Sequence, residues 1–171
     1  MATLPNIIAA FVSSQIVFVV MSLVTLPIIT RESEGLPPFD TTALAGYDYD
    51  YATRFVAALS SYGKTIYLYV QEPLDVLFPL LSAAFIVLSL TRLGMGRWAW
   101  AGFIPMVLDY IENIMVIIML TTSFGPPVPL VSSAMTQTKA VVTMVLYLLL
   151  VILFIRYLWR RRRVPCESST T

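Results

Sequence analysis

The sequence predicts an all-α integral membrane protein, a four-helix bundle with an amphipathic interfacial helix in its first outer loop. Of its 171 residues, 58% are hydrophobic and 12% are charged, which is far more apolar than a soluble domain of this length. Four stretches approach the roughly 20 apolar residues that a helix needs to cross a hydrocarbon core. The chain, residues 1–171, therefore reads as a single transmembrane domain.

The four predicted spans cover about residues 7–29, 73–90, 98–120 and 140–157. The first has no charged residue and ends at the polar stretch TRESEGLPP. It has no basic segment before it and no small-x-small cleavage site before that stretch, which favours a retained signal-anchor helix over a cleaved signal peptide.

The positions of the basic residues predict the orientation of the spans. Arg92 and Arg97 lie between the second and third spans, and Arg156 lies near the end of the fourth, before an arginine run. Basic residues in short loops stay on the inner side of a membrane. We therefore expect both termini on the cytoplasmic side, or on the matrix side of a mitochondrial membrane; the sequence does not indicate the organelle.

The first outer loop, residues 30–72, is too long to be a simple connection. Its segment DYDYATRFVAALSSYGK has apolar residues at helical spacing, after a capping aspartate, and Gly63 is expected to end or bend the helix. We expect this helix to lie on the membrane surface, with packing over the mouth of the bundle as the alternative. The third loop, TTSFGPPVPLVSSAMTQTK, is expected to be a short, stiff cap.

The basic inner tail, residues 158–171, predicts attachment to the membrane surface. Its anchoring residues are Trp159, Arg160, Arg161, Arg162 and Arg163. Each basic residue near an anionic surface contributes about 1 kcal/mol, and tryptophan favours the headgroup depth. Membrane lipids are therefore expected partners. A docking surface for a neighbouring subunit is the alternative, and nucleic acid is not an expected partner.

Three polar residues interrupt the third span, within MVLDYIENIM. Asp109, Glu112 and Asn113 are three and four residues apart, so they share one helical face within roughly 60°. An ionised acid at the centre of a bilayer costs about 2.5 to 3.5 kcal/mol. This face is therefore predicted to point into the protein, toward Asp75 at the start of the second span and Lys139 at the start of the fourth.

Three interpretations of this cluster remain open from the sequence. The residues either join helices, or bind a ligand, lipid or cation, or transfer protons. Two prolines add to the picture, because Pro79 and Pro105 each remove a backbone hydrogen bond and predict a bend in their spans. The bend at Pro105 is expected to lie beside the carboxylates.

The residues that are missing exclude several kinds of chemistry. The chain has no histidine and a single cysteine, Cys166. A Ser-His-Asp triad, haem ligation by histidine, thiolate metal clusters and internal disulfides are therefore excluded. We assign no metal ligand, cofactor or catalytic residue.

The segment GYDYDYATRFVAALSSYGKTIYLYVQEPLDVLFPLL, the motif IPMVLDYIENI and Lys139 resemble a family of small, functionally uncharacterised four-helix integral membrane proteins. That family has a Leu-Asp-x-x-Glu-Asn motif in its third span, and the resemblance covers about residues 46–147. It implies a four-helix architecture and a common role for Asp75, Asp109, Glu112, Asn113 and Lys139. It implies no reaction.

Two functions are predicted from these features. The first is a non-enzymatic accessory or structural subunit of a larger membrane complex, with other membrane-protein subunits as partners. The alternative is a protein that binds a small ligand, sterol or lipid through the carboxylates of the third span, with or without coupling of binding to proton transfer. An intramembrane enzyme that uses the two acids as proton donor and acceptor is the least favoured reading.

Overall fold

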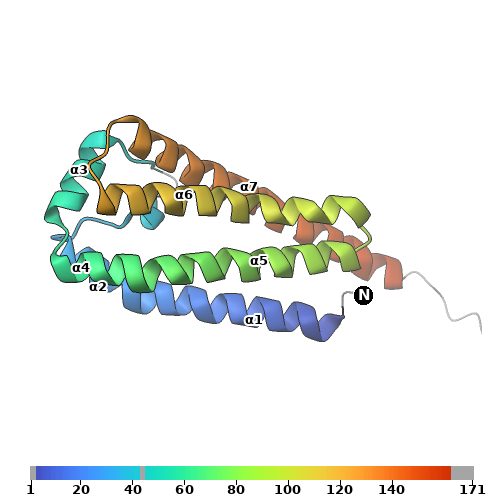
Figure 1. Ribbon diagram of the computed structural model, residues 1–171. Coiled ribbons are helices and arrows are strands. Elements are labelled where there is room, and N and C mark those ends of the chain that lie inside the picture. The colour runs from blue at the N-terminus through green and yellow to red at the C-terminus, as the bar shows by residue number, and fades with distance from the viewer. Residues whose placement is uncertain (1–2, 43–44, 163–171) are drawn as a thin grey trace, which may run out of the picture.

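The computed structural model describes residues 3–42 and 45–162 of the chain. This part of the chain is all-helical and has four helices long and apolar enough to cross a membrane, which confirms the all-α, four-helix part of the predicted fold class. These helices cover Leu4–Glu32, Ser61–Arg92, Gly96–Thr121 and Pro127–Arg160. In Figure 1 they run roughly side by side, and both described chain ends lie at the same end of the bundle as the connection between α5 and α6.

The first long helix contains a wide turn. It consists of α1 (Leu4–Val20), the π-helical turn η1 (Met21–Thr25) and α2 (Leu26–Glu32). The Leu26 N–H donates to the Met21 carbonyl, five residues back. The next residue, Pro27, has no N–H to donate, so the π turn accommodates a proline without ending the helix.

The second long helix repeats this arrangement. It consists of α4 (Ser61–Ile66), the π-helical turn η3 (Tyr67–Gln71) and α5 (Glu72–Arg92). Here the Glu72 N–H donates to the Tyr67 carbonyl, just before Pro73. The helix begins at Ser61 rather than near residue 73, because the Ser60 side chain caps it by accepting a hydrogen bond from the Gly63 N–H at 3.0 Å.

The third and fourth long helices also begin differently from the prediction. A 3₁₀ segment, η4 (Gly96–Phe103), leads into α6 (Ile104–Thr121), so Pro105 stands in the first turn of α6 and not in the interior of an α-helix. A first-turn proline needs no N–H acceptor, so Pro105 does not remove a hydrogen bond from the interior of a helix as expected, and the bend beside the carboxylates stays a prediction. Helix α7 (Pro127–Arg162) includes most of the segment predicted as a cap, because Pro127 and Pro129 fall in its first turn.

A short helix, α3 (Tyr49–Ala58), covers one end of the bundle, and a 3₁₀ turn, η2 (Phe39–Thr42), precedes it. The Asp48 side chain caps α3 by accepting a hydrogen bond from the Tyr51 N–H at 2.8 Å. Phe55 is fully buried, and α3 packs against α6 and α7. Helix α3 ends with Leu59 as its C-cap residue, and not at Gly63. Gly63 instead lies in α4, where this helix closely approaches Glu32.

The bundle has two halves. The half covered by α3, α4 and η2, here called the capped half, has an aromatic core; the half with the described chain ends is called the terminal half (Figure 1). The core of the capped half includes Phe39, Tyr47, Phe55, Tyr67 and Met119. The core of the terminal half is formed by Ile86, Leu90, Ala99, Leu146 and Leu150.

Candidate functional site

An ion cluster joins α6 to α7 within the capped half. The Lys139 ammonium contacts Asp109 Oδ1 and lies 2.6 Å from Glu112 Oε2. Asp109 is 5% exposed and Glu112 is fully buried. Because α7 begins at Pro127, Lys139 lies well inside the helix and not at its start. The charge therefore reaches the polar face of α6 from within the bundle.

Uncharged side chains extend this cluster to neighbouring helices. The Thr136 hydroxyl, one turn before Lys139, donates to Glu112 Oε1 at 2.6 Å. The Asn113 amide donates to the Asp75 backbone carbonyl at 3.3 Å. The polar face of α6 is therefore bonded to α7 on one side and to α5 on the other.

Gln71 joins the two π-helical turns to the carboxyl groups. Its amide nitrogen donates to Asp75 Oδ2 at 2.7 Å, and its carbonyl oxygen accepts a hydrogen bond from the Thr25 hydroxyl. Thr25 lies in η1 and Gln71 in η3, so the two turns meet beside the cluster. The sequence analysis missed Gln71, although its spacing of four residues from Asp75 places both on one helical face.

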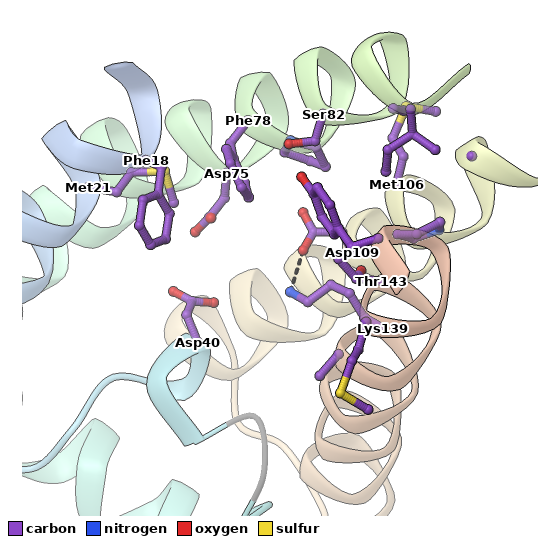
Figure 2. Close-up of a pocket in the computed structure, with 18 of the residues that line it drawn as sticks. Phe18, Met21, Asp40, Asp75, Phe78, Ser82, Met106, Asp109, Lys139 and Thr143 are labelled. Atoms are coloured by element: carbon purple, nitrogen blue, oxygen red, sulfur yellow. Dashed lines mark hydrogen bonds and ion pairs between the residues drawn. The ribbon is translucent and has the colours of Figure 1, made fainter. Parts of the chain in front are cut away.

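Asp40 enters the site from η2. Its Oδ2 lies 3.4 Å from the Tyr67 hydroxyl and 3.5 Å from the Gln71 amide nitrogen, and its carboxyl group faces that of Asp75 (Figure 2). Burial raises the pKa of Asp40, while the nearby Lys139 ammonium opposes this effect. Asp40 was not predicted, because only the folded loop brings it to the bundle.

A cavity of about 490 Å³ adjoins these charges. Its lining residues come from α1, α5, α6 and α7 and from the segments joined to them, so the cavity lies among the four long helices. Figure 2 shows that Asp40, Asp75, Asp109 and Lys139 lie toward one another, with Phe18 and Met21 on one side of them and Met106 on the other. Most of the wall is apolar; it includes Phe18, Met21, Phe78, Ile86, Met106 and Met144.

Two residues of the cavity wall also lie on the outer flank of the bundle. Phe18 of α1 is 48% exposed and Met144 of α7 is 65% exposed. These exposures show that the wall continues onto the flank between α1 and α7. In a membrane, this flank would face acyl chains.

Two oxygen atoms beside the cavity have unused hydrogen-bonding capacity. Within the described part of the chain, Asp109 Oδ2 and the Ser82 hydroxyl are buried without a hydrogen-bond partner. Both residues line the cavity. Buried polar atoms without partners are uncommon, and a bound water or ion is one explanation for them. The wall therefore offers polar atoms to an occupant of the cavity.

Two further predictions concern metal binding and anchoring to the membrane surface. Across residues 3–42 and 45–162, no group of three histidine, cysteine or acidic residues is arranged to hold a metal ion. Trp159 is 63% exposed and Arg160 is exposed at the end of α7. Arg163 and the side chains of Arg161 and Arg162 lie outside the described residues, so membrane anchoring by this run stays a prediction.

Comparisons with known proteins do not identify the chain. No protein-family model, curated protein or solved structure matches it. The resemblance to a family of four-helix membrane proteins therefore stays a prediction.

Proposed function

We propose that this chain is a multi-pass membrane protein that binds a small amphipathic molecule, of lipid or sterol type, in the cavity among its four long helices. The observation that carries the proposal is the composition of the cavity wall. One region of the wall holds charged groups, while the remainder is lined by apolar side chains from all four long helices.

The volume of the cavity supports this proposal. Sites for small molecules usually measure about 300 to 1,000 Å³ and combine apolar walls with a few convergent polar groups. The cavity of about 490 Å³ lies within this range. Its charged end suits a polar head and its apolar walls suit a hydrocarbon or ring system.

The exposed part of the wall suggests how the molecule enters. Phe18 and Met144 belong both to the cavity and to the outer flank of the bundle. A molecule dissolved in the bilayer would reach the cavity between α1 and α7 with its apolar part always in an apolar environment. A molecule that enters from water would have to pass the charged groups of the cavity before its apolar part reached the apolar wall.

Interhelical stabilisation alone accounts for only part of the site. Thr136, Asn113 and Lys139 each bond across a helix boundary, as polar residues in membrane bundles commonly do. The unpartnered oxygens of Asp109 and Ser82 bond no helix, and both residues line the cavity. An occupant of the cavity would supply both atoms with a partner.

A matched pair of substitutions on α7 tests binding. Thr143 lines the cavity, whereas Thr138 is exposed elsewhere on the same helix. We expect Thr143→Trp to fill the cavity and Thr138→Trp to leave it open. Native mass spectrometry of the purified protein should show a retained small molecule in the wild type and in Thr138→Trp, but not in Thr143→Trp. Identical bound masses in all three proteins would contradict the proposal.

The alternative function, an accessory or structural subunit of a larger membrane complex, has one observation in its favour. Gln15 lies in a groove on α1 among apolar residues such as Phe11, Val12 and Ile16, which are exposed. An amide on a lipid-facing surface is costly unless another helix covers it. Sizing in mild detergent tests this function, and a strictly monomeric protein would count heavily against it.

The orientation is part of the same proposal. We place both termini on the cytoplasmic or matrix side, with Trp159 and Arg160 at that surface and α3 at the opposite membrane interface. The distribution of basic residues supports this orientation. Protease digestion of sealed vesicles with a C-terminal tag would test it, because a tag on the predicted side is protected when the outer face of the membrane is exposed.

A further inference from the structure

The charged end of the cavity has more negative than positive groups. Five carboxyl groups lie near the single ammonium of Lys139, namely those of Asp40, Glu72, Asp75, Asp109 and Glu112. If all were ionised, four negative charges would lack a counter-charge in an apolar environment. Such an arrangement is stable only when protons or another cation neutralise the excess.

The ammonium of Lys139 is already committed to two partners. It contacts Asp109 Oδ1 and Glu112 Oε2, so it is poorly placed to bind an anionic head group. The second oxygen of Asp109 is buried, has no hydrogen-bond partner among the described residues and belongs to a cavity-lining residue that is 5% exposed. The atoms that remain available are therefore mainly acceptors.

We infer that the cavity selects an amphipathic molecule with a protonated amine head, which binds among Asp40, Asp75 and Asp109 while its apolar tail lies against Phe18, Phe78 and Met106. This inference rests on the proposed function, because it names the chemical class of the molecule in the same cavity. A charged N–H donor pairs with carboxylate oxygens more strongly than a neutral donor does.

Binding of the amine also displaces a proton. Before the amine binds, a proton on Asp40, whose pKa is raised by burial, neutralises part of the negative charge. When the ammonium head binds, that proton leaves for bulk water, so one positive charge enters as one leaves. The groups that face Asp40 are Tyr47 of the loop, Tyr67, Glu72 and Asp75 of the second long helix, Asp109 and Glu112 of α6, and Lys139 of α7.

Three probes with the same tail separate the head-group classes. The protein in lipid nanodiscs is titrated with octylamine, octanol and octanoate, and with sodium ion alone, while its thermal unfolding is followed. Thr143→Trp serves as the protein with a blocked cavity and Thr138→Trp as the protein with an open cavity. Partition of the probes into the bilayer affects both variants alike, so the difference between them reports binding in the cavity. We expect octylamine to stabilise the wild type and Thr138→Trp at the lowest concentration, and to act least on Thr143→Trp.

Two further measurements test the role of the carboxyl groups. Asp75→Asn should weaken octylamine binding roughly 10- to 100-fold, because a charge-assisted hydrogen bond is lost, and should leave octanol unaffected. Asp50→Asn, at an exposed position of α3, is the matched control. In the unmodified protein, octylamine affinity should fall by up to about tenfold per pH unit as the pH drops, because protons compete for the same carboxylates.

The outcomes distinguish this inference from the proposed function. Octanol or octanoate binding as tightly as octylamine, with sensitivity to Thr143→Trp, would overturn the inference and leave the proposed function standing. Stabilisation by sodium ion equal to that by octylamine would also overturn it. If no probe distinguishes Thr143→Trp from Thr138→Trp, both proposals fail. An octylamine affinity that is independent of pH would contradict proton displacement by the amine head.

Discussion

The capped half and the terminal half of the bundle are held together by different interactions. In the capped half, charged and amide groups bond across helices, and an aromatic core lies around them. In the terminal half, the core consists of aliphatic side chains and alanine. Gly102 lets η4 approach α5 there, since a Cβ would lie 2.9 Å from the side chains of Ile86 and Val87.

This difference indicates separate roles for the halves. Aliphatic packing brings helices together but tolerates many small displacements, whereas paired charges and hydrogen bonds allow few arrangements. The cavity lies where polar groups fix the positions of four long helices and η2. The terminal half keeps the helices together and supplies apolar cavity wall, including Ile86 and Gly102, while the capped half supplies the charged groups of the site.

The largest expected effect comes from removing the single ammonium of the cluster. Lys139→Met leaves Asp109 and Glu112 without their counter-charge, and breaking a buried ion pair typically costs about 3 to 5 kcal/mol. Denaturation of the protein in detergent micelles measures this loss. Lys64→Met, on α4 outside the cluster, is the control and should cost little. A loss for Lys139→Met below about 1 kcal/mol would show that the charges are not buried together.

A smaller effect is expected in the terminal half. Leu90 is fully buried, and Leu90→Ala should cost about 2 kcal/mol, the lower end for such a truncation, because lipid solvates the unfolded helices. Leu148→Ala, at a position that is 60% exposed, should change stability by less than about 0.5 kcal/mol. The same unfolding assay compares them. Equal losses would mean that this half is not packed as described.

The backbone conformation at Gly46 predicts an intermediate to small loss of stability when this glycine is replaced. Its φ is +69°, and a Cβ there would lie 2.5 Å from Gln137 Nε2 and 2.9 Å from Ser133 Oγ. Gly46→Ala should therefore cost about 1 to 2 kcal/mol through strain and crowding between the loop and α7. Gly35→Ala is a useful comparison, because its φ is also positive but its Cβ would meet nothing within 4 Å. Equal losses of stability in Gly46→Ala and Gly35→Ala would show that backbone strain accounts for the whole effect.

The smallest effect is a pH dependence of stability centred on Asp40. Its pKa in the folded protein is raised from 3.8, mainly by burial, so the folded state binds this proton more tightly than the unfolded state does. The contribution to stability is therefore full at low pH and is lost as the pH rises from about 4 through the raised pKa. Asp40→Asn should remove this part of the slope in unfolding titrations, and Asp50→Asn should keep it. An unchanged slope in Asp40→Asn would contradict the burial of this carboxyl group.

The sequence was sufficient for the helical architecture and for the residues that face one another across α6 and α7. Apolar length predicts the long helices, and the spacing of Asp109 and Glu112 predicts a shared face. The sequence did not reveal that α7 begins at Pro127, because prolines in a first helical turn look like loop residues. It also did not reveal Asp40, whose place depends on the fold of the loop and not on any helical spacing.

The cavity could not be predicted from the sequence either, because it too depends on how distant segments pack. Its wall combines side chains from α1, α5, α6 and α7 whose separation depends on how the helix pairs pack. The π-helical turns at Met21–Thr25 and Tyr67–Gln71 shift the register of two of these helices. Pro27 and Pro73 are visible in the sequence, but a proline alone does not say whether a helix bends, ends or widens.

The most direct test of the central claim, that the carboxyl groups and Lys139 form one electrostatic unit, is a double-mutant cycle. Lys139→Met is combined with the neutralising pair Asp109→Asn and Glu112→Gln, and the free energy of unfolding is measured for each protein. We predict that the neutralised pair recovers at least about 1.5 kcal/mol of the loss caused by Lys139→Met, because no charge is then left unpaired. Strictly additive losses would contradict the claim.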